Sequence, residues 1–217
     1  MPETPPRYIA VEGPIRVGKS SLARILAERV GGRLLLEPED HRHLRDFYTG
    51  QPGAAFRAQM HFLLQRYQQL SPLGPGRPYE TVIADYLFEK DKIFAYINLS
   101  DAELEVYNPY YELLRPQIAL PDLVIYLQAT PAVLRQRLLR KNQPGEAAVS
   151  DEYLGEVVKA YDHFFFRYSQ SDLLVINTSE IDFIERSEDL QALMRRLEEP
   201  ISGTQYYLPL GERPGSR

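Results

Sequence analysis

The segment GPIRVGKS at residues 13–20 has the residue types and spacing of a phosphate-binding loop. Its glycines let the backbone turn so that several N–H groups converge on an anion, and a helix that follows adds the positive end of its dipole. Lys19 can reach the β- and γ-phosphates of a nucleoside triphosphate, and the hydroxyl of Ser20 can ligate Mg²⁺. The predicted contacts of the nucleotide are Gly13, Gly18, Lys19, Ser20 and Ser21.

Asp85 is a second residue whose position suggests chemistry, because it ends the apolar run TVIA at residues 81–84. Proteins with a phosphate-binding loop place a Mg²⁺-directed carboxylate at the end of a strand. Taken alone, a strand-end aspartate is more often a cap or a turn residue, so the interpretation depends on the loop upstream. We predict Ser20 and Asp85 as the metal ligands.

Basic residues gather on the segment PAVLRQRLLRK at residues 131–141, which runs into a Pro/Gly turn. Arg137 and Lys141 are four residues apart and therefore share one helix face. On a lid that closes over transferring phosphates, such cations would offset developing charge. We interpret Arg135 as an ordinary surface residue. The guanine-reading tetrad Asn-Lys-x-Asp of GTPases is absent from the sequence.

These residues need a scaffold that brings them together. Short apolar runs alternate with longer amphipathic segments, which predicts an α/β fold with a five-stranded parallel sheet flanked by helices. The predicted strands are Tyr8–Glu12, Arg33–Glu37, Thr81–Asp85, Leu123–Gln128 and Leu173–Asn177. The predicted helices are Lys19–Val30, Phe56–Leu70, Leu87–Asn98, Asp101–Arg115, Pro131–Lys141, Ser150–Ser169 and Ser187–Glu198.

The 217 residues fit a single domain, 1–217, with a short lid at about 137–150. The tail from about residue 200 to 217 looks irregular, although its Tyr206, Tyr207 and Leu208 could dock on the body.

Composition excludes several function classes. The net charge of −5 argues against a nucleic acid polymer as partner, and the absence of cysteine excludes disulfides and thiolate sites. No apolar run approaches the ~18 residues of a membrane span, and the N-terminus lacks a signal pattern. The four histidines, with His41 and His43 in a predicted loop, lack metal-ligand spacing. We expect a soluble, cytoplasmic protein.

Several further segments occur in the order and spacing of one enzyme family. They are IAVEGPIRVGKSSLA, EPED, DFY, FRAQMHFLLQRYQQL, VIADYLFEKDKIFA, LPDLVIYLQATPAVLRQRL and EIDF. With them the chain resembles the deoxynucleoside kinases, and within that family the bacterial deoxyguanosine and deoxyadenosine kinases. The resemblance runs from Tyr8 to about Leu197. It implies a P-loop kinase fold, ATP as phosphate donor, Mg²⁺, a purine deoxynucleoside as acceptor, and a homodimer.

The resemblance also implies roles for particular residues. Glu37 matches the general base that takes the proton of the nucleoside 5′-hydroxyl, which is reasonable chemistry for a carboxylate within hydrogen-bond reach. Glu39 and Asp40 are close alternatives on sequence grounds. Tyr48 and Glu146 match the residues that hold the sugar 3′-hydroxyl.

The nucleobase would be read from one helix stripe and one aspartate. Gln59, Phe62 and Arg66 fall at i, i+3 and i+7, and Asp91 matches an aspartate that pairs with the arginine. Without the family, an ordinary ion pair on a helix surface would explain Arg66 and Asp91. These residues leave guanine, adenine and cytosine open. In the loop EIDF, Asp182 and Phe183 match residues that cradle the adenine of ATP.

The sequence departs from the family pattern at two places. Tyr86 follows Asp85 where many relatives have an arginine, a departure shared with the bacterial subgroup. In the lid, Lys141 and Gln143 stand where relatives have arginines, and Gln143 carries no charge. Arg140 or Arg16 could supply the missing charge; alternatively, Arg16 faces solvent or caps a carboxylate.

Two other functions remain open at the level of sequence. A nucleoside monophosphate kinase, such as a thymidylate kinase, would need an additional arginine for the acceptor phosphate, and Arg42, Arg45 and Arg57 are candidates. A non-catalytic nucleotide switch would bind the triphosphate without phosphorylating a nucleoside.

Overall fold

The computed structural model describes residues 6–38, 41–76, 78, 80–142 and 148–209. Within them, no helix is long and apolar enough to cross a membrane. Glu39, Asp40, Gln143 and Glu146, which the sequence analysis singled out, lie outside the described residues.

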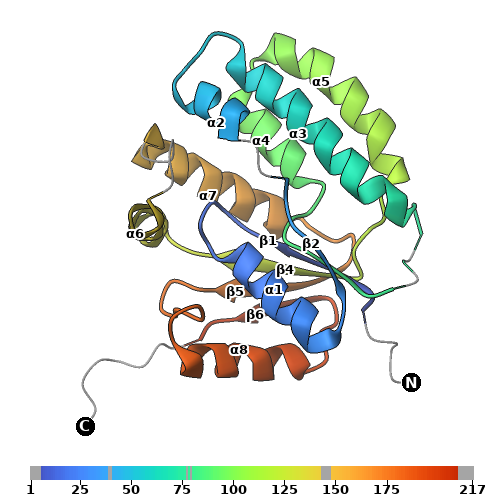
Figure 1. The fold of residues 1–217 in the computed structure, drawn as a ribbon, viewed down its shortest axis with the longest axis vertical. Coiled ribbons are helices and arrows are strands. Elements are labelled where there is room, and N and C mark those ends of the chain that lie inside the picture. The colour runs from blue at the N-terminus through green and yellow to red at the C-terminus, as the bar shows by residue number, and fades with distance from the viewer. Residues whose placement is uncertain (1–5, 39–40, 77, 79, 143–147, 210–217) are drawn as a thin grey trace.

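A parallel sheet of six strands forms the centre of the molecule (Figure 1). Its order is β2-β3-β1-β4-β5-β6, and every neighbouring pair is parallel. The strands are β1 (Tyr8–Glu12), β2 (Arg33–Leu35), β3 (Val82–Ala84), β4 (Leu123–Gln128), β5 (Asp172–Asn177) and β6 (Thr204–Tyr207). The predicted fold class is confirmed, but the predicted strand number of five is wrong.

The sixth strand comes from the tail that we expected to be irregular. Thr204–Tyr207 pairs in parallel with β5 at the edge of the sheet. Tyr207 packs against the main core, whereas Tyr206 is 63% exposed and Leu208 is 69% exposed. A short edge strand that buries only one face lacks the continuous apolar run by which the other strands were predicted.

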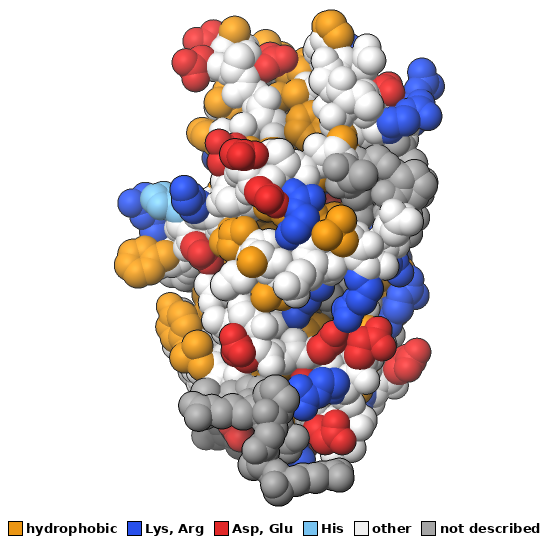
Figure 2. All heavy atoms as spheres, turned by 90° about the vertical axis from the view of Figure 1, so that its left-hand side faces the viewer, with side chains coloured by type: hydrophobic (Ala, Val, Ile, Leu, Met, Phe, Trp, Pro, Cys, Tyr) orange, Lys and Arg blue, Asp and Glu red, His pale blue; other side chains and the backbone are white. Residues whose placement is uncertain are grey.

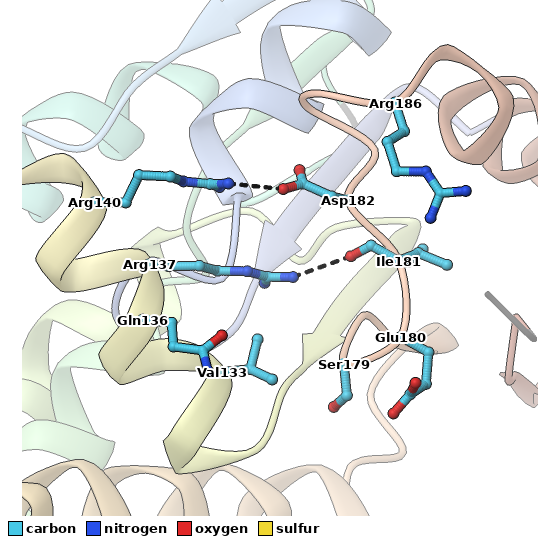
Figure 3. A pocket seen from close by; sticks show the side chains of 9 residues that line it. All are labelled: Val133, Gln136, Arg137, Arg140, Ser179, Glu180, Ile181, Asp182 and Arg186. Atoms are coloured by element: carbon cyan, nitrogen blue, oxygen red, sulfur yellow. Dashed lines mark hydrogen bonds and ion pairs between the residues drawn. The ribbon is translucent and has the colours of Figure 1, made fainter. Parts of the chain in front are cut away.

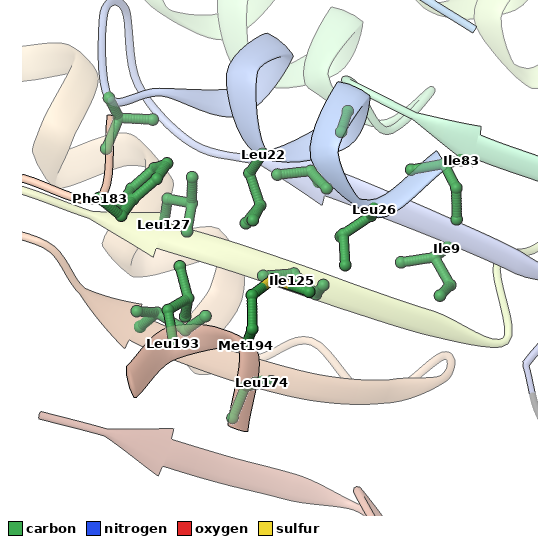
Figure 4. Close-up of a cluster of buried hydrophobic side chains, with 14 of the residues drawn as sticks. Ile9, Leu22, Leu26, Ile83, Ile125, Leu127, Leu174, Phe183, Leu193 and Met194 are labelled. Atoms are coloured by element: carbon green, nitrogen blue, oxygen red, sulfur yellow. The ribbon is translucent and has the colours of Figure 1, made fainter. Parts of the chain in front are cut away.

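Helices cover both faces of the sheet. Along β1, Ile9 and Val11 point into the core beneath α1 (Lys19–Val30) and α8 (Ser187–Glu198), which Figure 4 shows with Leu22 and Met194. Tyr8 and Ala10 point to the opposite face. That face is covered by α3 (Ala54–Leu70), α4 (Lys90–Asn98), α5 (Asp101–Leu114) and α7 (Asp151–Phe166).

One helix was not predicted. α2 (His41–Tyr48) forms where we placed a loop, and the ring of His43 stacks on that of His61 in α3 at 4.3 Å between centroids. The segment HRHLRDFY spans only eight residues and is mostly polar, so we placed a loop there, although Leu44, Phe47 and Tyr48 have helical spacing. α6 (Pro131–Lys141) begins and ends as predicted, with Thr130 as its N-cap accepting from the N–H of Val133. The 3₁₀ turns η1 (Ser71–Leu73) and η2 (Arg115–Gln117) complete the described elements.

Candidate active site

The phosphate-binding loop connects β1 to α1, as predicted. Gly13 and Gly18 have backbone φ angles of 151° and 113°, which residues with a side chain rarely adopt. A Cβ on Gly13 would lie 2.4 Å from the carbonyl oxygen of Leu127, and one on Gly18 would lie 2.7 Å from the ring of Phe183. Both glycines are therefore required by close approaches as well as by backbone conformation.

Lys19 lies over this loop. Its Nζ donates to the carbonyl oxygens of Gly13 at 2.9 Å and Pro14 at 3.1 Å. Burial, and next the positive charge of Lys90, lower the pKa of Lys19 to about 8. Both effects disfavour the ammonium form, which an anion placed in the loop would favour again.

A cavity of about 930 Å³ opens beside the loop. It extends from the start of α1 to α3 and α4, and α6 borders it as well. Figure 2 views the molecule from the end where α2, α6 and the start of α7 lie, and basic side chains there are interspersed with acidic and hydrophobic ones. The predicted site residues that line the cavity are Gly18, Lys19, Ser20, Ser21, Glu37, Tyr48, Gln59, Phe62, Arg66, Asp85, Arg137 and Lys141.

Three carboxylates stand where β1, β2 and β3 end. Asp85 is 4% exposed, and its Oδ1 accepts the backbone N–H of Glu37 at 2.5 Å. Glu12, which is fully buried, accepts the N–H of Gly13 at 2.8 Å and that of Leu87 at 2.7 Å. Glu12 thus ties the phosphate-binding loop to the segment after β3. The sequence analysis missed it, although it ends a strand as Asp85 does.

The carboxylate of Glu37 is held by two cations. Arg66 Nη2 donates to Oε1 at 2.6 Å, and Lys90 Nζ donates to Oε2. Burial alone would raise the pKa of Glu37, but Lys90, Arg66 and Lys19 together hold it well below its usual range. Glu37 is therefore ionised and faces the cavity. Lys90 was missed in the sequence, where no local pattern marks it.

Tyr86, where many relatives have arginine, does not face this carboxylate. Its side chain is fully buried in the core between α3 and the sheet, and its hydroxyl donates to Gln69. The positive charge beside Glu37 comes from other positions of the chain.

Asp91 organises the far end of the cavity. Gln59 Nε2 donates to the Asp91 carbonyl at 2.8 Å and to Oδ1 at 2.6 Å, and Arg66 Nη1 donates to Oδ2. The hydroxyl of Tyr107, in α5, donates to Oδ1 at 2.6 Å. Because the amide nitrogen of Gln59 donates to Asp91, the side-chain carbonyl oxygen of Gln59 remains free to accept a hydrogen bond from the nucleobase. Arg66 also lies 5.2 Å from the ring centroid of Phe62. Tyr107 was not predicted from the sequence.

Arg137 holds the predicted lid against the body. Its guanidinium donates to the carbonyl oxygens of Val17, Thr178 and Ile181 and to the Thr178 hydroxyl, at 2.8–3.2 Å. Burial lowers its pKa. Arg140 Nη1 pairs with Asp182 Oδ2 at 3.0 Å. These residues line a second cavity of about 360 Å³ between α6 and the loop at 179–186 (Figure 3).

The remaining basic residues of α6 divide between surface and cavity. Arg135 pairs with Asp151 at 2.6 Å and donates to the carbonyl of Val149, so it joins α6 to the start of α7. Lys141 is exposed and borders the main cavity. Phe183 is 2% exposed because its ring packs on Gly18.

The sequence comparisons identify the family. A sequence model of the deoxynucleoside kinase family matches residues 9–202 of the chain. The chain belongs to the deoxynucleoside kinase family. As a deoxynucleoside kinase it is a phosphotransferase, which decides against the monophosphate kinase and the non-catalytic switch.

Named relatives extend over nearly the whole chain. The deoxyguanosine kinase of Bacillus subtilis is 31% identical over 204 residues, which cover 89% of this chain and 97% of that protein. The deoxyadenosine/deoxycytidine kinase of the same organism is 24% identical over 208 residues, covering 91% and 94%. The structure of deoxyadenosine kinase from M. mycoides with bound dATP has a TM-score of 0.73 at 22% identity, covering 88% and 98%. The last likeness shows the shared P-loop kinase fold.

Proposed function

We propose that this deoxynucleoside kinase transfers the γ-phosphoryl group of ATP to the 5′-hydroxyl of a purine deoxynucleoside. The observation that carries the proposal is that Lys19 and Glu37 line one cavity whose other end holds Gln59 and Arg66. A donor phosphate at the loop and a nucleobase at α3 would leave the 5′-hydroxyl between them. The purine preference is supported by the named relatives, a deoxyguanosine kinase and a deoxyadenosine/deoxycytidine kinase.

Glu37 is the proposed general base. Its ionised carboxylate accepts the proton of the 5′-hydroxyl as the bond between O5′ and the γ-phosphorus forms and the bond to the β,γ-bridging oxygen breaks. ADP leaves with that oxygen, and the proton remains on Glu37 until it passes to solvent. Lys19, Arg137 and Lys141 offset the charge on the phosphoryl oxygens. For Arg137 this requires that some of its carbonyl contacts open when ATP binds.

Ser20 and Asp85 are the proposed ligands of Mg²⁺. Both border the main cavity, and Asp85 is a buried carboxylate with Oδ1 already accepting an N–H. Its Oδ2 and the Ser20 hydroxyl are hard oxygen donors of the kind that Mg²⁺ prefers. When bound, the ion neutralises charge on the β- and γ-phosphates.

The adenine of ATP is assigned to the smaller cavity, which Arg137 and Asp182 line from opposite sides (Figure 3). Phe183, which follows Asp182 in the chain, packs its ring on Gly18 of the phosphate-binding loop. On the acceptor side, Tyr48 at the end of α2 borders the main cavity and is the proposed partner of the sugar 3′-hydroxyl, with Glu146 as the second.

A homodimer is proposed from an apolar stripe on α5. Val106, Tyr110 and Leu113 are 49%, 50% and 66% exposed and lie on one helix face. Such a stripe fits a second copy of the chain. Light scattering should give twice the monomer mass for the natural protein and the monomer mass for Leu113→Glu; a natural monomer would contradict the dimer.

A panel of the four deoxynucleosides, each with ATP and Mg²⁺, tests the function. We expect the highest kcat/KM with deoxyguanosine or deoxyadenosine. Glu37→Gln keeps the shape of the side chain and should lower kcat by roughly 100-fold or more, since a general base contributes about that much. Phosphorylation of dTMP without turnover of any deoxynucleoside would overturn the proposal.

A further inference from the structure

Lys90 is a buried lysine at the first position of α4, and the sequence analysis gave it no role although it lies within the segment VIADYLFEKDKIFA. It is 6% exposed and borders the main cavity. Its Nζ donates to Glu37 Oε2 and lies 5.7 Å from the centroid of the Phe94 ring. Burying an ammonium group is costly unless a partner compensates it, so its position calls for an explanation in terms of Glu37.

The surroundings place Lys90 between the two halves of the site. Burial raises the pKa of Glu12 and would raise that of Glu37, and at both carboxyls Lys90 is the cation that opposes this most. Burial lowers the pKa of Lys19, and the charge of Lys90 adds to this. Its charge thus acts on the phosphate-binding loop and on the acceptor side together. Among the described residues, Glu37 is the one hydrogen-bond acceptor of its ammonium group. Two of its three N–H donors remain for other oxygens in the cavity.

We propose that Lys90 is a positioning residue for phosphoryl transfer: its ammonium group fixes the carboxylate of Glu37 toward the acceptor hydroxyl. The inference rests on the proposed role of Glu37. Arg66 holds the other oxygen of Glu37 but also binds Asp91, so it is tied to the nucleobase end. Among the described residues, Lys90 forms an ion pair with Glu37 and with no second carboxylate.

A purely structural ion pair predicts a different result from a positioning role. If Lys90 only stabilised the fold, its loss would lower the melting temperature and leave the kcat of the folded protein unchanged. If it orients Glu37, kcat falls while the substrates bind as before. The effect must also disappear when Glu37 cannot act as a base.

The test uses the full-length protein with deoxyguanosine, deoxyadenosine, ATP and Mg²⁺. Lys90→Met keeps the length of the side chain without its charge, and Lys90→Arg keeps the charge. Lys92→Met is the matched control, because Lys92 lies two residues further on and pairs with Glu112 at 2.9 Å on the surface. Glu37→Gln and the double variant Glu37→Gln/Lys90→Met complete a double-mutant cycle. The double variant lacks both charges of this ion pair, so neither charge is left without the other.

We expect Lys90→Met to lower kcat by about 100-fold, the size of a lost preorganised electrostatic contact. The Kd of the nucleoside and of ATP should stay within about threefold, and Lys90→Arg should recover at least about a tenth of the activity. In the Glu37→Gln background the same change should cost less than about threefold, because the two residues act as a unit.

A kcat of Lys90→Met within about threefold of the natural protein, with Glu37→Gln strongly impaired, would overturn the role of Lys90 and leave the proposed function intact. Multiplicative losses in the double variant would also overturn it. If Lys90→Met does not fold, Lys90→Gln takes its place, because its amide can still donate to Glu37 but carries no charge; its kcat should fall likewise, and an unchanged kcat would overturn the role. Failure of the natural protein to phosphorylate any deoxynucleoside would instead remove the proposed function itself.

Discussion

The acceptor side and the donor side of the site are built from different kinds of contact. On the acceptor side, the ion pair between Arg66 and Asp91 has side chains that are 5% and 0% exposed. On the donor side, the pair between Arg140 and Asp182 has side chains that are 53% and 27% exposed. Similar residue types therefore form a buried network on the acceptor side and an exposed ion pair on the donor side. We call the pair between Arg140 and Asp182 the clasp.

This difference indicates which side can move. Removing one partner of a buried ion pair leaves an uncompensated charge, so such a network holds its geometry. An exposed pair competes with water and contributes little. We infer that the acceptor pocket is preformed, whereas the clasp between α6 and the loop at 179–186 can open and close around ATP.

A substitution at Asp91 tests this difference between the two sides, and we expect it to have the largest effect on stability. Asp91→Asn should lower the free energy of unfolding by about 3–5 kcal/mol, because Arg66 loses one of its two anions in a buried position. Urea denaturation measures the change. The matched variant on the donor side is Asp182→Asn, which should lose less than about 1 kcal/mol. Equal losses in the two variants would show that burial does not distinguish the two sides.

Tyr107 sharpens the comparison, because it supports the acceptor network from a helix that does not line the cavity. Tyr107→Phe removes one donor from Asp91 and should destabilise the protein by about 1–3 kcal/mol. It should also lower kcat/KM for the deoxynucleoside more than kcat/KM for ATP, since Gln59 depends on Asp91 for its orientation. Tyr96→Phe, at a position of α4 that is 57% exposed, is the control that should change neither quantity. Equal effects on both substrates would contradict a role confined to the acceptor side.

Sequence reasoning reached the parts of the molecule that depend on local pattern. Five strands were predicted because each is apolar nearly throughout, and the phosphate-binding loop was predicted because all its determinants lie within residues 13–20. β6 and α2 were missed, because one buries a single face at the sheet edge and the other is a short polar helix.

The same limit applies to the site. Glu37, Gln59, Arg66 and Asp91 were assigned through a family resemblance, and without it Arg66 and Asp91 would have been interpreted as a surface pair. Glu12, Lys90 and Tyr107 were missed for a common reason. Each is defined by a contact with a residue that is distant in the chain, such as Leu87 for Glu12 and Glu37 for Lys90. No local period encodes a contact of that kind.

Arg16→Gly tests the donor side at the phosphate-binding loop itself, and we expect it to have the smallest effect on stability and on activity. Its φ of 62° lies in the left-handed region, which glycine adopts without strain. Arg16→Gly should therefore change the free energy of unfolding by less than about 1 kcal/mol, since relieved strain is offset by the greater entropy of glycine in the unfolded chain. Its side chain is partly exposed beside the main cavity, so water and salt screen its charge in part. We expect kcat and the KM for ATP to stay within about twofold, which corresponds to less than about 0.5 kcal/mol. A tenfold loss of kcat at unchanged KM would instead make Arg16 a substitute for the charge that Gln143 cannot supply, and the loop would then contribute two cations to the transferring phosphoryl group.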